Sequence, residues 1–313
     1  MQGFNEIIYT PDLAKRVSFV LTTKNRKQYL EKALKNTRNI IGQNDELIII
    51  DGNSTDGTQE IIKSNLDFID IFISEDDEGQ GHAFNKGLLF ARGKYICLLT
   101  DDDVFFQKAI EQAVIIMEKH LDIDVLIPGG MKEKNGKKWY VYMREGSDFG
   151  RNVESLYTNN WCGLGIFIRT NSISIAGLSD PYCVALDSSY IAQCINRGLN
   201  VKFARINMYY HRIYEHSGTV AKFNSWEKDY YQICKQYCSR SFYLNFRWNI
   251  WRKKYKWLPH FDLMVLPYRS IRILLTKGPS SFIRKAKKRI FKEDRSDNVM
   301  DKSPEIIWDG TIN

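Results

Sequence analysis

The most constraining feature of the sequence is an alternation of apolar runs with amphipathic stretches over about its first 130 residues. Val17–Thr23, Glu46–Ile50 and Lys94–Leu99 are short apolar runs of the kind found in strands buried on both faces. Between the first two, Lys27–Ile41 carries mostly apolar side chains at helical spacing. Strands that alternate with helices predict an α/β fold with a mostly parallel central sheet and helices on both faces.

Polar segments follow these three predicted strands. They are Thr22–Asn25, Asp51–Asp56 and Thr100–Asp103. Ligands of open α/β sheets bind at the carboxyl ends of the strands. We therefore expect the three segments to lie together at one edge of the sheet, with several carboxylates among them.

Two of these segments allow both a functional and an ordinary structural interpretation. The adjacent acids Asp101–Asp103 repel one another unless a cation or hydrogen-bond donors neutralise them, and Mg²⁺ and Mn²⁺ prefer carboxylates together with phosphate oxygens. The same acids could form a solvated turn, or a cap for a helix that begins near Phe106. In Asp51–Thr58, small residues let a ligand approach the backbone, but this segment taken alone fits better an ordinary loop with Asp56 as a helix cap.

Taken together and in order, these segments resemble the inverting glycosyltransferases of family 2, which have the GT-A nucleotide-sugar-binding fold. The similarity is carried by four segments, namely VSFVLTTKNR (17–26), ELIIIDGNSTDGT (46–58), ISEDDEGQGHAFNKG (73–87) and ARGKYICLLTDDDVF (91–105). It covers residues 17–105 well and is thinner beyond them. Lys24, His82 and Gly52 depart from the residues that many members carry, which leaves the nucleobase and the donor sugar undetermined.

The resemblance implies roles for individual residues. The nucleotide-sugar would be bound by Thr22, Thr23, Asn25, Asp51, Asn53, Asn85, Asp101 and Asp102. A divalent cation, Mn²⁺ or Mg²⁺, would be bound by Asp102, Asp103 and His216. His211 is a weaker candidate nearby, because a lone histidine is more often a packing or surface residue.

Inverting transfer also requires a general base for the acceptor hydroxyl. The segments Gly177–Asp180 and Ala185–Gly198 resemble the part of the family that supplies this base, and Asp187 takes the position of the carboxylate. Leu186 stands where the family usually has Glu, and Asp187 could instead only cap its helix. Trp161 with Cys162 and Gly163 would line the acceptor pocket, unless Trp161 is simply a core residue.

The net charge of +8 is concentrated near the C-terminus, because residues 240–295 hold 16 Lys and Arg against three acids. We divide the chain into a lead-in (1–13), a GT-A catalytic domain (14–220), a helical basic extension (221–296) and a flexible tail (297–313). Within the catalytic domain, 14–105 would bind the nucleotide-sugar and 106–220 the acceptor. Basic and aromatic residues in 240–295 suit contact with an anionic membrane surface. A pair of solvated basic helices packed on the catalytic domain is the alternative; no nucleic-acid-binding fold accompanies the charge.

The sequence also bears on location. The N-terminus lacks the apolar core of a signal peptide, and no apolar run reaches the roughly 18 residues of a membrane-spanning helix. The six cysteines form no CxxC pair, which is typical of reduced thiols. We therefore expect a cytoplasmic protein that touches the membrane, if at all, from its surface.

The resulting prediction is a metal-dependent inverting glycosyltransferase that uses a nucleotide-sugar, most simply a UDP-sugar, and a glycan or lipid-linked acceptor. Two alternatives stay open. A catalytically inactive sugar-binding or scaffold protein could keep the same fold, and Leu186 is compatible with it. A nucleotidyltransferase would need a glycine-rich phosphate loop after the first strand, and TTKNRKQY (22–29) contains no glycine.

Overall fold

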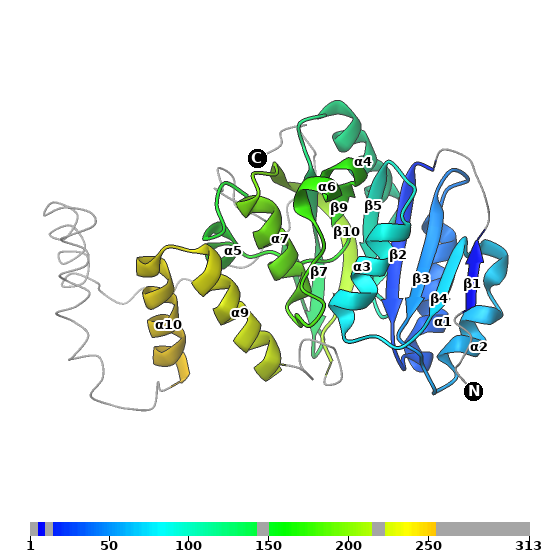
Figure 1. Ribbon diagram of the computed structural model, residues 1–313, viewed down its shortest axis with the longest axis horizontal. Coiled ribbons are helices and arrows are strands. Elements are labelled where there is room, and N and C mark those ends of the chain that lie inside the picture. Colours follow the sequence, from blue (N-terminus) through cyan, green and yellow to red (C-terminus); the bar gives the residue numbers. More distant parts are fainter. Residues whose placement is uncertain (1–5, 10–14, 143–149, 215–222, 255–313) are drawn as a thin grey trace, which may run out of the picture. The chain divides into compact units, whose positions relative to one another are not determined.

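The computed structural model describes residues 6–9, 15–142, 150–214 and 223–254 (Figure 1). The chain divides into two compact units. The first comprises residues 1–243 with 310–313, and the second comprises residues 244–309. All the strands described below, and every helix up to α9, belong to the first unit.

The first unit is built on one ten-stranded sheet, counted over the described residues. The order along the sheet is β1-β4-β3-β2-β5-β9-β7-β10-β6, and β8 pairs with β7. The strands are β1 (Glu6–Tyr9), β2 (Val17–Thr23), β3 (Glu46–Asp51), β4 (Ile71–Ser74), β5 (Tyr95–Leu99), β6 (Val104–Phe105), β7 (Val125–Lys134), β8 (Lys137–Val141), β9 (Phe167–Arg169) and β10 (Val201–Arg212).

The sheet is parallel where the sequence predicts it to be. Strands β4, β3, β2 and β5 are mutually parallel, and β7 is parallel to β10. The short strand β9 is antiparallel to both β5 and β7 and joins these two parallel parts into a mixed sheet. Strand β1 pairs antiparallel with β4, so the segment predicted as a lead-in adds a strand to the sheet.

Helices cover both faces of the sheet (Figure 1). They are α1 (Lys27–Ile40), α2 (Thr58–Lys63), α3 (Gln80–Phe90), α4 (Gln107–Lys119), α5 (Ser155–Thr158), α6 (Ile173–Ala176), α7 (Leu186–Asn196), α9 (Phe223–Tyr237) and α10 (Arg240–Lys254). Helices α3, α6 and α7 share one apolar cluster with the strands, and α1, α2 and α4 share the other. The predicted α/β fold with helices on both faces is therefore confirmed.

Strand β3 shows how the sequence produces the two layers. All six of its residues are buried. Ile48 and Ile50 pack in the cluster with α3 and α7, whereas Leu47 and Ile49 pack in the cluster with α1 and α4. Successive side chains of a strand point to opposite faces, so a continuous apolar run satisfies both layers at once.

The hairpin formed by β7 and β8 closes through Asn135 and Gly136. Both residues have positive φ, at 52° and 79°, which is the backbone of a type I′ turn and suits the Asn-Gly pair. Strand β7 pairs with β10 as far as Glu133 and carries Lys132 on the same strand as the buried Ile127.

Candidate functional site

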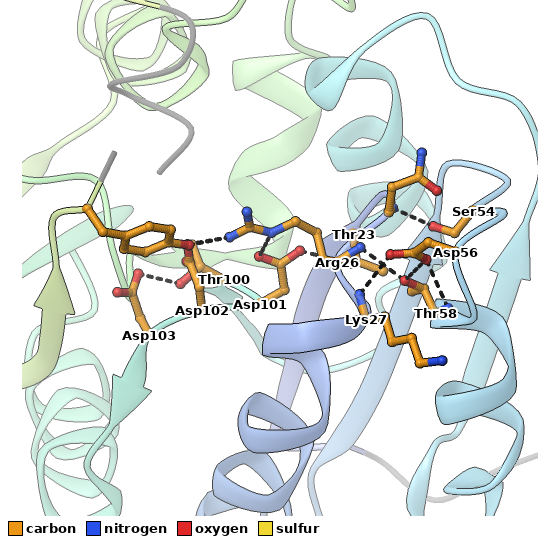
Figure 2. A network of polar contacts seen from close by, with 12 residues as sticks. Thr23, Arg26, Lys27, Ser54, Asp56, Thr58, Thr100, Asp101, Asp102 and Asp103 are labelled. Carbon is orange, nitrogen blue, oxygen red and sulfur yellow. Dashed lines mark hydrogen bonds and ion pairs between the residues drawn. The ribbon is translucent and has the colours of Figure 1, made fainter. Parts of the chain in front are cut away.

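The carboxyl ends of β2, β3 and β5 lie side by side, as expected for three neighbouring parallel strands. Thr23 and Asp51 end the first two strands and are register partners. The turn Asp101–Asp103 follows β5 directly. Figure 2 shows Thr23, Arg26 and the three acids facing one another across this edge of the sheet.

Arg26 follows β2 and reaches the acidic turn after β5 through its guanidinium group. Its Nε donates to Asp101 Oδ1 at 3.2 Å, and its Nη2 donates to Asp102 Oδ2 at 2.5 Å. Thr23 Oγ1 donates to the second oxygen of Asp101 at 2.8 Å. Arg26 is the N-cap residue of α1, so the first turn of that helix places its side chain over the acidic turn.

Tyr214 completes this group from the far end of β10. Its hydroxyl donates to Asp102 Oδ2 at 2.5 Å and accepts from Arg26 Nη2 at 2.7 Å. Its ring stacks on that of Tyr29, with centroids 5.2 Å apart, and the Arg26 guanidinium lies 4.2 Å from the Tyr29 centroid. The sequence analysis did not single out Tyr214; its position between the two histidines at 211 and 216 was the available signal.

Asp103 lies deeper than the other two acids and is buried. Its Oδ2 accepts from Thr100 Oγ1 at 2.6 Å, and its Oδ1 lies 2.7 Å from His211 Nδ1. The antiparallel pairing of β6 with β10 brings these two residues together. His211, the weaker histidine candidate, therefore contacts the acidic turn, whereas His216 lies outside the described residues.

Burial and neighbouring charges shift the pKa values of Asp101 and Arg26. Burial raises the pKa of Asp101 to about 6, against the opposing attraction of Arg26. For Arg26, burial acts to lower the pKa, but the attraction of Asp101 and the bond to Tyr214 outweigh it, so the pKa is raised and the guanidinium stays charged. Arg26 thus provides positive charge where three carboxylates converge.

The remaining residues proposed for the nucleotide differ in exposure. Asp51 is buried and accepts from the Ser54 N–H at 3.0 Å, from the Ser54 hydroxyl and from the Ser74 hydroxyl. Asn25 and Asn53 are exposed and have positive φ, at 53° and 58°, in the two loops beside Asp51. Thr22 is half-buried in β2. The hydrogen bonds of Asp51 therefore hold the loop after β3 in place, while Asn25 and Asn53 are exposed at the edge of the candidate site.

Asn85 of α3 lies elsewhere in the hydrogen-bond network. Its Nδ2 donates to the Ser179 carbonyl at 2.9 Å, and its Oδ1 accepts from the Ser179 N–H at 2.8 Å. Both ends of the amide are thus engaged with the segment that precedes α7. In this structure Asn85 connects α3 to that segment.

Asp187 lies in the first turn of α7, against the backbone of Gly163. A Cβ atom on Gly163 would stand 2.2 Å from Asp187 Cβ, so only glycine fits there. Burial raises the pKa of Asp187, while the Ser188 N–H, bonded to Oδ1 at 2.7 Å, and the positive charge of Lys132 act in the opposite direction. Cys162 and Lys132 also interact, which places the predicted acceptor-pocket residues Cys162 and Gly163 beside Asp187.

The acidic turn has the right kind of ligand for a divalent cation. Carboxylate oxygens are what Mg²⁺ and Mn²⁺ prefer, so the chemistry of Asp101, Asp102 and Asp103 fits such an ion. Over the described residues, however, no three His, Cys, Asp or Glu side chains are arranged to hold one. The positive charge among these carboxylates is supplied by Arg26.

The fold and the candidate site together define an α/β protein with an acidic turn at the carboxyl edge of its sheet, the edge at which open α/β sheets bind ligands. Residues 18–176 match the family described as Glycosyl transferase family 2, and the chain belongs to that family. The resemblance found in the sequence is thereby confirmed.

Relatives with curated descriptions are named as glycosyltransferases. An uncharacterized glycosyltransferase of Methanocaldococcus jannaschii is 36% identical over 115 residues, 35% of this chain and 40% of that protein. One of Rickettsia prowazekii is 29% identical over 135 residues, 43% of this chain and 41% of that protein. The chain thus spans about two fifths of the length of these relatives.

Solved structures share the fold. TarS (residues 1–349) of S. aureus in complex with UDP-GlcNAc has a TM-score of 0.54 at 16% identity, covering 70% of this chain and 65% of that one. The mannosyltransferase PcManGT of Pyrobaculum calidifontis in complex with GDP-Man and Mn²⁺ also has a TM-score of 0.54, at 14% identity, covering 94% and 92%. Both likenesses confirm the GT-A fold.

Proposed function

We propose that the chain is a metal-dependent inverting glycosyltransferase that moves a sugar from a nucleotide-sugar to an acceptor hydroxyl. The observation that supports this most is the convergence of three strand ends on the turn Asp101–Asp103 in a member of glycosyltransferase family 2. A nucleoside diphosphate is an anionic ligand, and a divalent ion held by the acidic turn would supply the positive charge that it needs.

The donor would lie along that edge. Thr22, Thr23, Asn25, Asp51, Asn53, Asp101 and Asp102 would surround the nucleotide, with Asn85 behind them. Asp102, with Asp103 and His216, would hold the divalent ion. When bound, that ion would neutralise the negative charge of the departing nucleoside diphosphate.

Asp187 would deprotonate the acceptor hydroxyl. A general base works best when its pKa lies near the working pH, and burial moves the Asp187 pKa in that direction. Attack on the anomeric carbon from the side opposite the leaving group would invert its configuration. The helix-start position of Asp187 keeps its backbone fixed while the carboxylate faces the Cys162–Gly163 backbone.

Further observations favour a particular donor, acceptor and location. Structural neighbours in complex with UDP-GlcNAc, and with UDP and Mn²⁺, favour a UDP-sugar and Mn²⁺, although one neighbour has GDP-Man. The charge of residues 240–295 favours a lipid-linked or cell-surface glycan as acceptor and contact with an anionic membrane surface on the cytoplasmic side. Most of that segment lies outside the described residues; in the part that is described, no helix is long and apolar enough to span a bilayer.

The test is release of nucleoside diphosphate by the full chain from UDP-, GDP- and dTDP-sugars with Mn²⁺ or Mg²⁺, in the presence of glycan and lipid-linked acceptors. We expect release from one donor, its loss in EDTA, and a decrease of about 100-fold or more in Asp102→Ala and in Asp187→Asn. Asp67→Asn, an exposed acid paired only with Arg38, is the matched control and should keep full activity.

Two results would contradict the proposal. Absence of release from every donor would favour a binding or scaffold role. Full activity in EDTA would remove the metal from the mechanism. The anomeric configuration of the product, read by NMR, decides separately whether the transfer is inverting.

A further inference from the structure

The guanidinium of Arg26 occupies the carboxylate oxygens that a metal ion would use. It contacts Asp101 at 3.2 Å and Asp102 at 2.5 Å. The side chain is only 20% exposed, and it is held from the other side by the Tyr29 ring and the Tyr214 hydroxyl. This arrangement is a fully formed ion-pair group (Figure 2).

The backbone of Arg26 is fixed as firmly as its side chain. Its N–H donates to Thr58 Oγ1 at 3.0 Å, and the next N–H, that of Lys27, donates to Asp56 Oδ2 at 3.1 Å. Both acceptors lie at the start of α2, in the loop that follows β3. The first turn of α1 is therefore attached to the same edge of the sheet as the acidic turn, and Arg26 is preorganised to reach it.

A guanidinium and a divalent cation cannot both take full advantage of the same carboxylates. Asp102 Oδ2 already accepts from Arg26 and from Tyr214, and Thr23 and Arg26 each donate to one oxygen of Asp101. A divalent ion placed on these oxygens would also stand a few ångströms from a permanent positive charge and be repelled by it.

We propose that Arg26 is a built-in counter-ion that competes with the divalent cation for Asp101 and Asp102. Without nucleotide, the protein then binds the metal weakly, because the metal must displace Arg26 from both carboxylates. Tyr214 stabilises the arginine-bound state by bonding to both partners of the pair. The inference rests on the proposed function only in taking the acidic turn as the metal site.

The test is Mn²⁺ binding to the full chain without nucleotide, measured by calorimetry and by water-proton relaxation. Arg26→Gln removes the charge and keeps a side chain of similar length, so we expect Mn²⁺ to bind at least tenfold more tightly than to the wild type. Arg26→Lys keeps a point charge that cannot span two carboxylates, so its affinity should lie between the two. Mn²⁺ binding by Arg26→Gln no tighter than by the wild type would overturn the proposal.

A matched control separates this effect from a general loss of positive charge. Arg38 lies on the same helix and pairs with Asp67 at the exposed end of α1. Arg38→Gln should therefore leave Mn²⁺ affinity unchanged; an equal gain in both variants would count against a specific competition.

A second change locates the ion. In the double variant Arg26→Gln, Asp102→Asn, the gained affinity should disappear; if it persists, the ion binds elsewhere and the proposal is wrong. Should Arg26→Gln fail to fold, Tyr214→Phe gives the same test, with an expected gain of about threefold, because it removes one bond to each partner. No nucleotide is present in any of these titrations, so their outcome is independent of donor turnover, and failure of the proposed transferase activity would be seen separately.

Discussion

At the scale of single residues, the environment of Asp187 sets the pH range in which it could serve as the proposed base. Burial raises its pKa, and the Ser188 N–H and the charge of Lys132 limit that rise. A carboxyl with a raised pKa stays protonated to a higher pH than an ordinary aspartate. A base must be deprotonated, so the transfer rate should fall as the pH drops through this raised pKa, and the acid limb of the profile should lie above the ordinary range.

Lys132 gives a direct test of this electrostatic balance. Lys132→Met removes the positive charge that lowers the pKa of Asp187, so that pKa should rise further. We expect the acid limb of kcat/KM against pH to move to higher pH. Lys134→Met, two residues along the same strand, should leave the limb in place. A limb that stays fixed, or moves to lower pH, in Lys132→Met would show that Asp187 is not the titrating base.

At the scale of elements, helix α7 depends on its neighbour α9. Helix α7 has no side-chain cap at its own N-cap residue, Ala185. Instead, Asp229 of α9 accepts from the Val184 N–H at 2.6 Å and from the Ala185 N–H at 3.2 Å. Neither helix falls in the segment 18–176 that matches the family. The part of the first unit beyond the family match thus holds the start of the helix that carries Asp187.

Removing this cap should weaken both the helix and the proposed reaction. For Asp229→Ala we expect a loss of about 1 to 2 kcal/mol in the free energy of unfolding, the usual cost of a lost N-terminal cap. Because the first turn of α7 would lose its anchor, kcat should fall while the affinity for the nucleotide stays the same. Lys228→Ala, at the exposed neighbouring position, is the control. Urea denaturation and steady-state kinetics measure the two effects, and an unchanged midpoint would show that the cap contributes nothing.

The strands and helices also show which parts of the fold can be predicted from the sequence and which cannot. The runs that become β2, β3 and β5 were predictable, because a strand buried on both faces must be apolar throughout. Strand β9 has only three residues, too few for a period to be recognised. The contacts of Arg26 with Tyr214 and of Val184 with Asp229 join residues 188 and 45 positions apart. Such contacts depend on which elements pack together, and no local pattern encodes that.

The acidic turn illustrates the same limit within the site. Its position at the edge of the sheet follows from the strand order and was predicted correctly. That Arg26 neutralises it did not follow, because the sequence offered no reason to choose this arginine over the neighbouring Lys24 or Lys27. Asp56 and Thr58 of the loop after β3 accept hydrogen bonds from the backbone at the start of α1. These bonds fix Arg26 at the position from which its side chain reaches the acidic turn.

At the scale of the whole first unit, several separate contacts join the two halves of the sheet. Strand β9 bridges β5 and β7, and Asn85 bonds to both backbone groups of Ser179, 94 positions away. Ser179 lies in the segment that leads to α7. The amide of Asn85 therefore connects helix α3 to the segment that precedes α7, the helix that carries the proposed base Asp187.

This coupling predicts that Asn85 contributes more to stability than to ligand binding. Asn85→Ala deletes two buried hydrogen bonds and leaves the Ser179 N–H and carbonyl without their partner, so the free energy of unfolding should fall by about 2 kcal/mol. Asn65→Ala is the matched control, because its main bond, to the Ile61 carbonyl, is local to one turn, and it should cost less than about 0.5 kcal/mol. Urea denaturation and nucleotide titration are measured on both variants. If Asn85→Ala kept its stability but lost nucleotide affinity, the amide would act on the ligand, as the family resemblance implies, and its two bonds to Ser179 would not stabilise the fold.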